Sequence, residues 1–338
     1  MRRALIAAGL VLAMSAFAVG TYEAAAYLKA GRAHVQRPSQ TAAASLPGTI
    51  YVVQGGAIYR LQNGKFGQIT PEAGWMQPSA DPDGNRLVAV RRQSNVSDLY
   101  LLDRNGRVAG QLTHNSSPSV EFNHWAFYPR FSADGSQIFF DYDPKDPYGS
   151  YRADLAIFAR PLDTAARSSV QWSYPNQYTG GDVSPVPLRA GGLIYTKFSI
   201  DGESKVHSQI WLQSRPGSPG VALTDPDADC LQPALSSDEH LLAMVCGKTQ
   251  PMSVDLVLAG FNPTTPSLGA STVLTRGQLV ASPSFSPDGK TVAYLAPATS
   301  GGGFQLWTIP ATESTTPTPR QISSELDLAA TSAPLWLQ

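Results

Sequence analysis

The fold is decided by the stretch Ser282-Pro283-Ser284-Phe285-Ser286-Pro287-Asp288-Gly289-Lys290-Thr291-Val292-Ala293-Tyr294-Leu295, which has the pattern of one β-hairpin. Pro287 fixes a negative φ and Gly289 tolerates a positive one, so together they favour a tight turn. The alternating run from Thr291 to Leu295 is typical of the strand that returns from such a turn.

This hairpin pattern recurs along the chain. Related copies lie at Gln77-Pro78, Tyr128-Pro129, Ser184-Pro185 and Gln232-Pro233, and a half-copy, Ala333 to Leu337, ends the sequence. The leading prolines are residues 78, 129, 185, 233, 283 and 334, so their spacings are 51, 56, 48, 50 and 51 residues. A nearly constant spacing in this range indicates an array of equivalent structural units.

Each complete unit contains four strand-like runs, but the first unit contains only three. Its runs, between Thr49 and Thr70, are joined by turns at Gly55-Gly56 and Asn63-Gly64, and the Pro-led first strand is missing. The half-copy at Ala333 to Leu337 supplies that strand. The sequence therefore predicts an all-β, six-bladed β-propeller, closed by pairing the C-terminal strand with the three N-terminal strands.

Two of the repeated motifs resemble the repeat of TolB-type (WD40-like) β-propellers. They are Phe285-Ser286-Pro287-Asp288-Gly289-Lys290, followed by Val292-Ala293, and Phe131-Ser132-Ala133-Asp134-Gly135. The resemblance covers residues 49–337 and implies the propeller domain only. It leaves no space for the α/β domain that precedes the propeller in TolB, or for a C-terminal hydrolase domain as in prolyl-oligopeptidase-like peptidases. The repeat occurs in proteins of different functions, so it implies a fold and no single activity.

The N-terminus has the features of an export signal. Met1-Arg2-Arg3 is basic, Ala4 to Gly20 is apolar, and Ala16-Phe17-Ala18 offers a small-residue cleavage site. The apolar run is also near the lower limit of about 17 residues for a transmembrane helix, so residues 1–28 are either a signal peptide or a membrane anchor. Residues 29–47 predict a flexible tether, and residues 48–338 the propeller. We expect a membrane-anchored protein facing away from the cytoplasm, or a periplasmic or extracellular one if the signal is cleaved.

Composition excludes several functional classes. A net charge of −1 over 338 residues provides no basic field for nucleic acid. The sequences Gly247-Lys248-Thr249 and Gly289-Lys290-Thr291 imitate the end of a phosphate-binding loop but lack the glycine required upstream. The chain contains no Gly-x-Ser-x-Gly nucleophile elbow, and we predict no catalytic residue from any linear motif.

The two cysteines are expected to form a structural disulfide. If Leu235 pairs with Leu241 across the turn of the fifth unit, Cys230 lies opposite Cys246. Two cysteines facing each other on adjacent strands of an exported protein favour a disulfide over two free thiols.

Three long insertions are expected on one face of the ring, at residues 115–127, 142–153 and 199–208. Repeat proteins concentrate variable function in insertions on one face, and these contain a mixture of aromatic and charged side chains that suits a binding surface. The candidate binding residues are His124, Trp125, Tyr128, Asp143, Asp146, Tyr148, Tyr151, Glu203 and His207. The competing interpretation is that these side chains only pack the loops onto the ring.

No cofactor is expected, with calcium as the alternative. Asp141, Asp143 and Asp146 could converge on a hard cation, but Pro144 stiffens the segment and the glycine and terminal glutamate of a helical calcium loop are missing. None of the five histidines lies three or four residues from another, so a zinc site has no local signature.

The sequence favours a monomeric binding or scaffold module of the bacterial cell envelope, whose partner is an envelope protein or a saccharide. The alternative is a propeller enzyme of the glycosidase or lactonase type. Its reactive groups would converge on the central channel from several blades and escape any linear motif. Whether the protein is an enzyme stays open, with binding favoured over hydrolysis.

Overall fold

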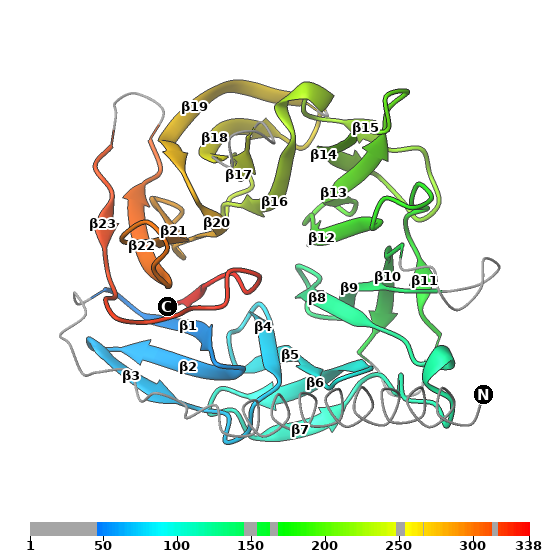
Figure 1. Ribbon diagram of the computed structural model, residues 1–338, viewed down its shortest axis with the longest axis horizontal. Coiled ribbons are helices and arrows are strands. Elements are labelled where there is room, and N and C mark those ends of the chain that lie inside the picture. The colour runs from blue at the N-terminus through cyan, green and yellow to red at the C-terminus, as the bar shows by residue number, and fades with distance from the viewer. Residues whose placement is uncertain (1–45, 145–153, 163–167, 248–253, 266, 313–316) are drawn as a thin grey trace, which may run out of the picture. The chain divides into compact units, whose positions relative to one another are not determined.

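A computed structural model describes residues 46–144, 154–162, 168–247, 254–265, 267–312 and 317–338. Within these residues, six four-stranded antiparallel sheets are arranged in a ring around a central axis (Figure 1). The chain runs through one sheet after another, and each sheet is one blade of a propeller. The predicted all-β, six-bladed fold is thus confirmed.

Each blade contains four strands, named from the inner strand outward. Blade 1 contains β24 (Leu335–Leu337), β1 (Thr49–Gln54), β2 (Ala57–Gln62) and β3 (Lys65–Gln68). Blade 2 contains β4 (Trp75–Ala80), β5 (Arg86–Arg92), β6 (Ser97–Asp103) and β7 (Val108–Gln111). Blade 3 contains β8 (Ala126–Phe131), β9 (Gln137–Tyr142), β10 (Ala156–Pro161) and β11 (Val170–Gln171). Blade 4 contains β12 (Asp182–Pro187), β13 (Leu193–Ile200), β14 (Val206–Gln213) and β15 (Val221–Ala222). Blade 5 contains β16 (Cys230–Leu235), β17 (Leu241–Cys246), β18 (Val254–Asn262) and β19 (Ser267–Gln278). Blade 6 contains β20 (Ala281–Phe285), β21 (Thr291–Pro297), β22 (Phe304–Pro310) and β23 (Arg320–Gln321). Two short 3-10 helices, η1 (Val120–Phe122) and η2 (Pro226–Ala228), lie in the connections before blades 3 and 5.

The ring closes through the two ends of the propeller. Strand β24 pairs antiparallel with β1, with Leu335 opposite Tyr51 and Leu337 opposite Thr49. The side chain of Trp336 is 7% exposed, and its Nε1 donates to the Pro47 carbonyl at 2.8 Å. This is the closure that the incomplete first unit and the C-terminal half-copy predict.

A hydroxyl at the end of each fourth strand explains why every unit ends in threonine or serine. In each blade this hydroxyl accepts the backbone N–H of a residue in the third strand, which is β2 in blade 1. The hydroxyl and N–H pairs are Thr70 and Ile58, Thr113 and Leu99, Ser173 and Ile157, Thr224 and Ile210, Thr275 and Leu256, and Ser323 and Leu306. A backbone N–H of the third strand thereby finds a side-chain acceptor inside the blade.

The disulfide is present, but the register that suggested it differs by one residue. Leu235 pairs with Leu242 rather than with Leu241, and a bulge between Leu231 and Ala234 then shifts the register back. Cys230 is therefore opposite Cys246, and the two are joined by a disulfide. The extra residue of a β-bulge is the reason that counting from the turn was in error there.

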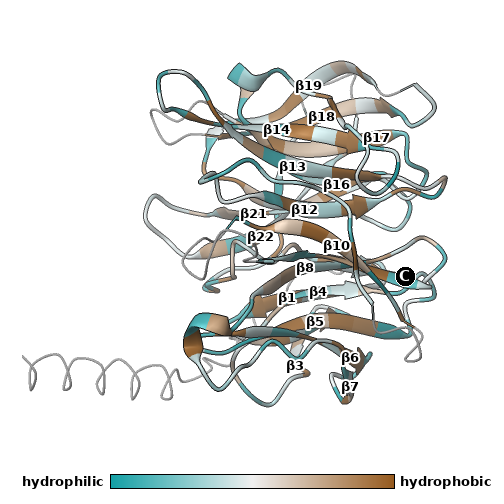
Figure 2. Cartoon of the chain, turned by 90° about the vertical axis from the view of Figure 1, so that its right-hand side faces the viewer, coloured by the Kyte–Doolittle hydropathy of each residue, from teal (hydrophilic) through white to brown (hydrophobic). Residues whose placement is uncertain are grey.

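Apolar side chains fill the space between blades. Fully buried examples are Leu87 in blade 2, Ile157 in blade 3, Ile194 in blade 4 and Leu256 in blade 5. Figure 2 shows hydrophobic colouring along the strands and hydrophilic colouring in many of the connecting loops. Among the described residues no helix is long and apolar enough to cross a membrane. The predicted signal or anchor, residues 1–28, and nearly all of the tether at 29–47 lie outside that range.

Candidate functional site

One face of the ring carries the connections between blades and the loops between second and third strands. Because the strands of a blade are antiparallel, the start of the first strand, the end of the second and the start of the third lie at the same end of the blade. The segments 113–125, 173–181 and 201–205 all leave the sheets at that end. We call this end the loop-bearing face.

Three of the sequence-predicted residues form one cluster there. The Asp143 side chain is 1% exposed, and its Oδ1 accepts the backbone N–H of Trp125 at 2.6 Å. The Nδ1 of His124 lies 2.8 Å from the Asp143 carbonyl and 3.3 Å from its Oδ1. Asp143 therefore fixes the segment that enters blade 3 through contacts of its buried carboxylate.

Aromatic rings surround this cluster. His124 stacks on Tyr142 with ring centroids 5.0 Å apart, and Trp125 stacks on Phe127 at 5.9 Å. The Arg92 guanidinium lies over the Trp125 ring, with its Cζ 5.6 Å from the centroid. A cation over a ring stabilises an exposed site by about 0.5–1 kcal/mol.

Glu203 and His207 lie in the second-to-third-strand hairpin of blade 4. Glu203 is exposed in the turn, whereas His207 is 7% exposed. The Nε2 of His207 is 2.9 Å from Asp201 Oδ2, and its Nδ1 is 3.1 Å from the Pro226 carbonyl. Two acceptors around one imidazole favour its doubly protonated form, and the hydrogen bond to Asp201 raises the pKa of His207.

Tyr128 lies apart from both groups, in the wall of the central channel. Its backbone N–H donates to Gln77 Oε1 at 2.8 Å, and burial raises the pKa of its phenol to about 12. The remaining candidates, Asp146, Tyr148 and Tyr151, lie outside the described residues. The structure thus places the six described candidates in three separate locations.

The calcium hypothesis is not tested, because Asp146 belongs to it. Asp141 and Asp143 already accept backbone N–H groups, from Ser184 and Trp125 respectively. Among the residues that the structure describes, no group of three or more His, Cys, Asp or Glu side chains is arranged to hold a metal ion.

The channel wall is built from the residues that precede the leading prolines. Five of them have a positive φ and lie at the bulge of an inner strand: Gln77 at 53°, Tyr128 at 48°, Ser184 at 60°, Gln232 at 56° and Ser282 at 51°. The N–H of each is accepted by a side chain from the preceding blade or connection. In the same order these are Ser332, Gln77, Asp141, Thr196 and Gln232. Such strained backbone persists only where its surroundings hold it, and here these bonds link each blade to the next.

The channel encloses a cavity of about 30 Å³ with one arginine, Arg130, in its described lining. Burial lowers the pKa of Arg130, and the nearby Asp141 opposes that shift. Asp141 is fully buried, and its Oδ1 accepts no hydrogen bond from the described residues. Burial therefore raises the pKa of Asp141 well above its ordinary value.

Sequence reasoning missed Arg130 as a channel residue, although aligning the repeats reveals it. The residue after the leading proline is Ser79, Arg130, Val186, Ala234, Ser284 or Leu335 in the six units. Asp141 likewise occupies the cross-strand position that holds Val90, Thr196, Val245 and Leu295 in other blades. Blade 3 alone carries a charge at each of these positions.

Blade 4 adds an ion pair at the loop-bearing end of its inner strand, with Asp182 fully buried and the Lys197 side chain 14% exposed. Lys197 Nζ lies 3.0 Å from Asp182 Oδ1, and Lys197 also donates to the Tyr174 carbonyl at 3.1 Å. Burial raises the pKa of Asp182, and Lys197 opposes this shift. The pair ties the connection between blades 3 and 4 to the second strand of blade 4.

That same connection presents exposed tyrosines. The Asp154 side chain is 6% exposed and accepts the backbone N–H groups of Tyr178, Thr179 and Gly180 at 2.8–3.0 Å. Tyr178 has a φ of 61° and is 78% exposed. A buried carboxylate therefore holds the loop in a conformation that directs a tyrosine to solvent.

Solved structures of other proteins contain similar propellers. No known protein-family profile matches the chain, and no curated protein sequence matches it. TolB from Acinetobacter baumannii superimposes with a TM-score of 0.63 and 19% identity, over 86% of this chain and 66% of that one. A proposed TolB from Agrobacterium tumefaciens gives 0.58 and 12%, over 85% of this chain and 92% of that one. The fold is that of the TolB-type propellers.

A propeller from a nidogen/laminin complex is also similar, with a TM-score of 0.56 and 13% identity, over 85% of this chain and 96% of that one. At these identities the likenesses establish the fold alone. This chain spans just under two thirds of the A. baumannii TolB chain.

Proposed function

We propose that this protein is an exported propeller, tethered to the membrane by residues 1–28, that docks an envelope protein on its loop-bearing face. One observation carries the proposal: of the large exposed apolar side chains in the part of the chain that the structure describes, most lie on that face. We define the loop patch as Val120, Phe122, Tyr174, Tyr178, Ile200 and Val206, which are 42–78% exposed. They come from connections before blades 3 and 4 and from a hairpin of blade 4.

The loop patch has the composition of a protein interface. Interface cores are enriched in aromatic residues, and a few of these carry most of the binding energy. Tyr178 and Tyr174 are the most exposed of the six, and the hydrogen bonds to Asp154 and Lys197 hold their backbone in place. Because these loops are already ordered, binding a partner would cost little of their conformational entropy. This favours tight binding.

The fold comparison supports a location in the cell envelope without specifying a partner. The TolB-type propellers resemble this chain in fold, and one similar propeller was solved in a nidogen/laminin complex. The hydrolase alternative gains no support from a channel cavity of about 30 Å³. Small-molecule sites usually enclose roughly 300–1,000 Å³.

Photo-crosslinking in intact cells tests the proposal. A photoreactive residue at position 178 or 122 of the full chain should give the same adduct with one envelope protein. The same residue at position 108 or 170, whose valines are 45% and 50% exposed on outer strands, is the matched control. An adduct of equal yield at all four positions, or an adduct with glycan at 178 and 122, would overturn the protein-docking proposal.

A further inference from the structure

A second site lies between blades 4 and 5, apart from the loop patch. It is a cleft of about 750 Å³, bounded by the segment 223–228 of blade 4 and by β17, β18 and β19 of blade 5. Its volume falls in the range of roughly 300–1,000 Å³ that is typical of ligand sites. The channel cavity is far smaller.

Unequal strand lengths produce this cleft. The outer strand of blade 4, β15, has 2 residues, whereas the outer strand of blade 5, β19, has 12. Neighbouring blades cover each other's faces, so the short strand leaves part of the longer one uncovered. Leu268 and Val273 of β19 line the cleft as a result and remain half-buried.

The floor of the cleft is apolar and belongs to the packed core. Met244 and Val257 are 2% and 7% exposed and line it from β17 and β18, and Leu223 lines it from blade 4. These side chains pack in the cluster that joins the two blades. The floor is therefore rigid and offers apolar surface to an incoming aliphatic group.

Three carboxylates stand around this floor. Asp225 and Asp227 are exposed on the blade 4 side, and Asp255 lies on the blade 5 side. Asp225 Oδ1 accepts the N–H of Asp227 at 2.8 Å, and Asp255 Oδ1 accepts the N–H of Gly277 at 2.8 Å. The described lining contains no lysine, arginine or histidine, so its field favours a cationic ligand.

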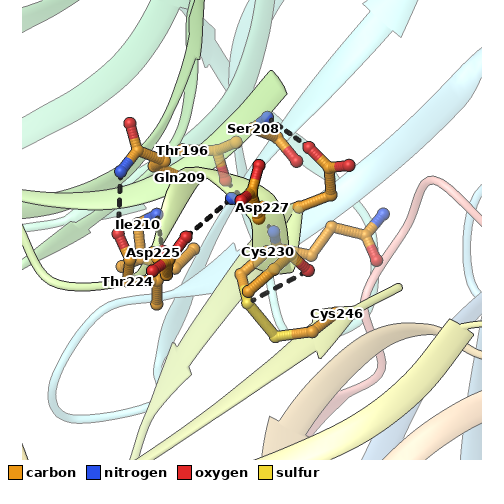
Figure 3. The surroundings of a disulfide bond; sticks show 12 residues. Thr196, Ser208, Gln209, Ile210, Thr224, Asp225, Asp227, Cys230 and Cys246 are labelled. Atoms are coloured by element: carbon orange, nitrogen blue, oxygen red, sulfur yellow. Dashed lines mark hydrogen bonds between the residues drawn. A yellow bond between two sulfur atoms is a disulfide. The ribbon is translucent and has the colours of Figure 1, made fainter. Parts of the chain in front are cut away.

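The disulfide forms part of the wall (Figure 3). Cys230 and Cys246 both line the cleft and join β16 to β17, and Cys230 Sγ lies 3.8 Å from the carbonyl of Ala228. Figure 3 shows Asp225 and Asp227 close to this bond, with the dashed line from Asp227 to Asp225. A covalent link at this point fixes the distance between the acidic segment and the apolar floor.

We propose that this cleft binds a cationic, aliphatic peptide segment of a partner protein. An aliphatic side chain would lie on the floor at Val257, beside Val273 of β19, and lysine or arginine side chains would pair with Asp225, Asp227 and Asp255. This combination of apolar floor and acidic rim selects against acidic and against purely polar segments. The cleft shares no residue with the loop patch, so the inference does not depend on the function proposed above.

Fluorescence anisotropy with synthetic peptides on the full, detergent-solubilised chain tests this site. The probe is a labelled peptide of alternating lysine and leucine, and the comparison peptides replace lysine by glutamate or leucine by serine. We expect binding of the lysine–leucine peptide only, weakened by salt as exposed ion pairs are. Equal binding of the lysine–serine peptide would overturn the proposal, since charge alone would then explain the affinity.

Two variants locate the binding. The triple variant Asp225→Asn, Asp227→Asn, Asp255→Asn should weaken affinity about tenfold, since three ion pairs at two exposed carboxylates and one half-buried carboxylate together correspond to about that factor. A matched triple variant, Glu72→Gln, Asp83→Asn, Asp327→Asn, removes equal charge from exposed positions outside the cleft and should bind like the parent.

Ser271→Trp fills the cleft from an exposed position of β19 without altering the core. It should abolish binding while leaving the melting temperature unchanged. Parent-like affinity in both the cleft triple variant and Ser271→Trp would overturn the assignment.

Discussion

Replacement of Trp336 by alanine tests how much of the stability depends on ring closure. The side chain is 7% exposed between blades, and burial losses of this kind cost about 3–5 kcal/mol for tryptophan. The hydrogen bond from Nε1 to the Pro47 carbonyl, 2.8 Å long, contributes about 1 kcal/mol of that difference. Trp336→Phe keeps most of the apolar contact and loses the donor, so it should cost about 1–2 kcal/mol.

Urea denaturation measures both variants, and hydrogen exchange separates closure from general loss of packing. Trp307 is the matched control, because its Nε1 donates to the Ala296 carbonyl at 3.0 Å inside blade 6. Trp336→Ala should accelerate amide exchange in β1, which pairs with β24, and Trp307→Ala should not. The closure argument fails if Trp336→Ala costs less than about 1 kcal/mol, or if β1 exchanges equally in both alanine variants.

Three further predictions follow from the described contacts. Replacing Cys230 and Cys246 by serine should lower the free energy of unfolding by about 3 kcal/mol in urea, because the bond spans a sequence separation of 16; an unchanged midpoint would contradict this. Asp141→Asn keeps an acceptor for Ser184 and removes a carboxyl whose pKa is raised in the folded state. The parent should therefore lose stability as pH rises above about 4, and the variant's melting temperature should depend less on pH; parallel profiles would refute it. His207→Gln should be most destabilising below about pH 6.5, because the raised pKa of His207 means that the folded state favours the protonated imidazole. A loss of stability in the variant that is just as large at alkaline pH would count against this.

The sequence was sufficient to predict the propeller because one short hairpin motif is repeated along it at a nearly constant spacing. The six prolines set the number of blades, and the incomplete first unit together with the half-copy at the C-terminus set the closure. Bulges were not predictable by counting, as the pairing of Leu235 with Leu242 shows. At each of the five bulges the N–H of the residue with positive φ is accepted by a side chain 36 to 255 positions away, and such a distant contact has no signal in a local count.

For the candidate site, the sequence allowed a prediction of where the long loops lie but not of the contacts their side chains make. Sequence reasoning selected the loop-bearing face and chose side chains by chemical type, yet His124, Trp125 and Asp143 are joined by contacts that hold the loop in place. The exposed Tyr178 was not selected, because its exposure depends on the hydrogen bonds to Asp154, a residue of another segment. Burial of one side chain by a distant one has no linear signal, whereas a charge at a repeat position such as Arg130 does.

The loop-bearing end of the blades also explains how long loops can form a rigid surface. One cross-strand position there, at the start of the inner strand, carries a different link in three blades: Arg91 over Trp75 at 5.5 Å, Asp182 with Lys197 at 3.0 Å, and the disulfide of Cys230 with Cys246. Strand ends fray first, and each of these links joins two strand ends just where a loop departs. At the opposite end, Asp134 illustrates how the turns are held by local hydrogen bonds to Ser132 and Ser136. The two ends of a blade are therefore held in different ways, by links between strands at one end and by hydrogen bonds within the turn at the other. Turns need only close, whereas loops that dock a partner, as proposed above, would have to start from fixed points, because ordering a mobile loop on binding costs entropy.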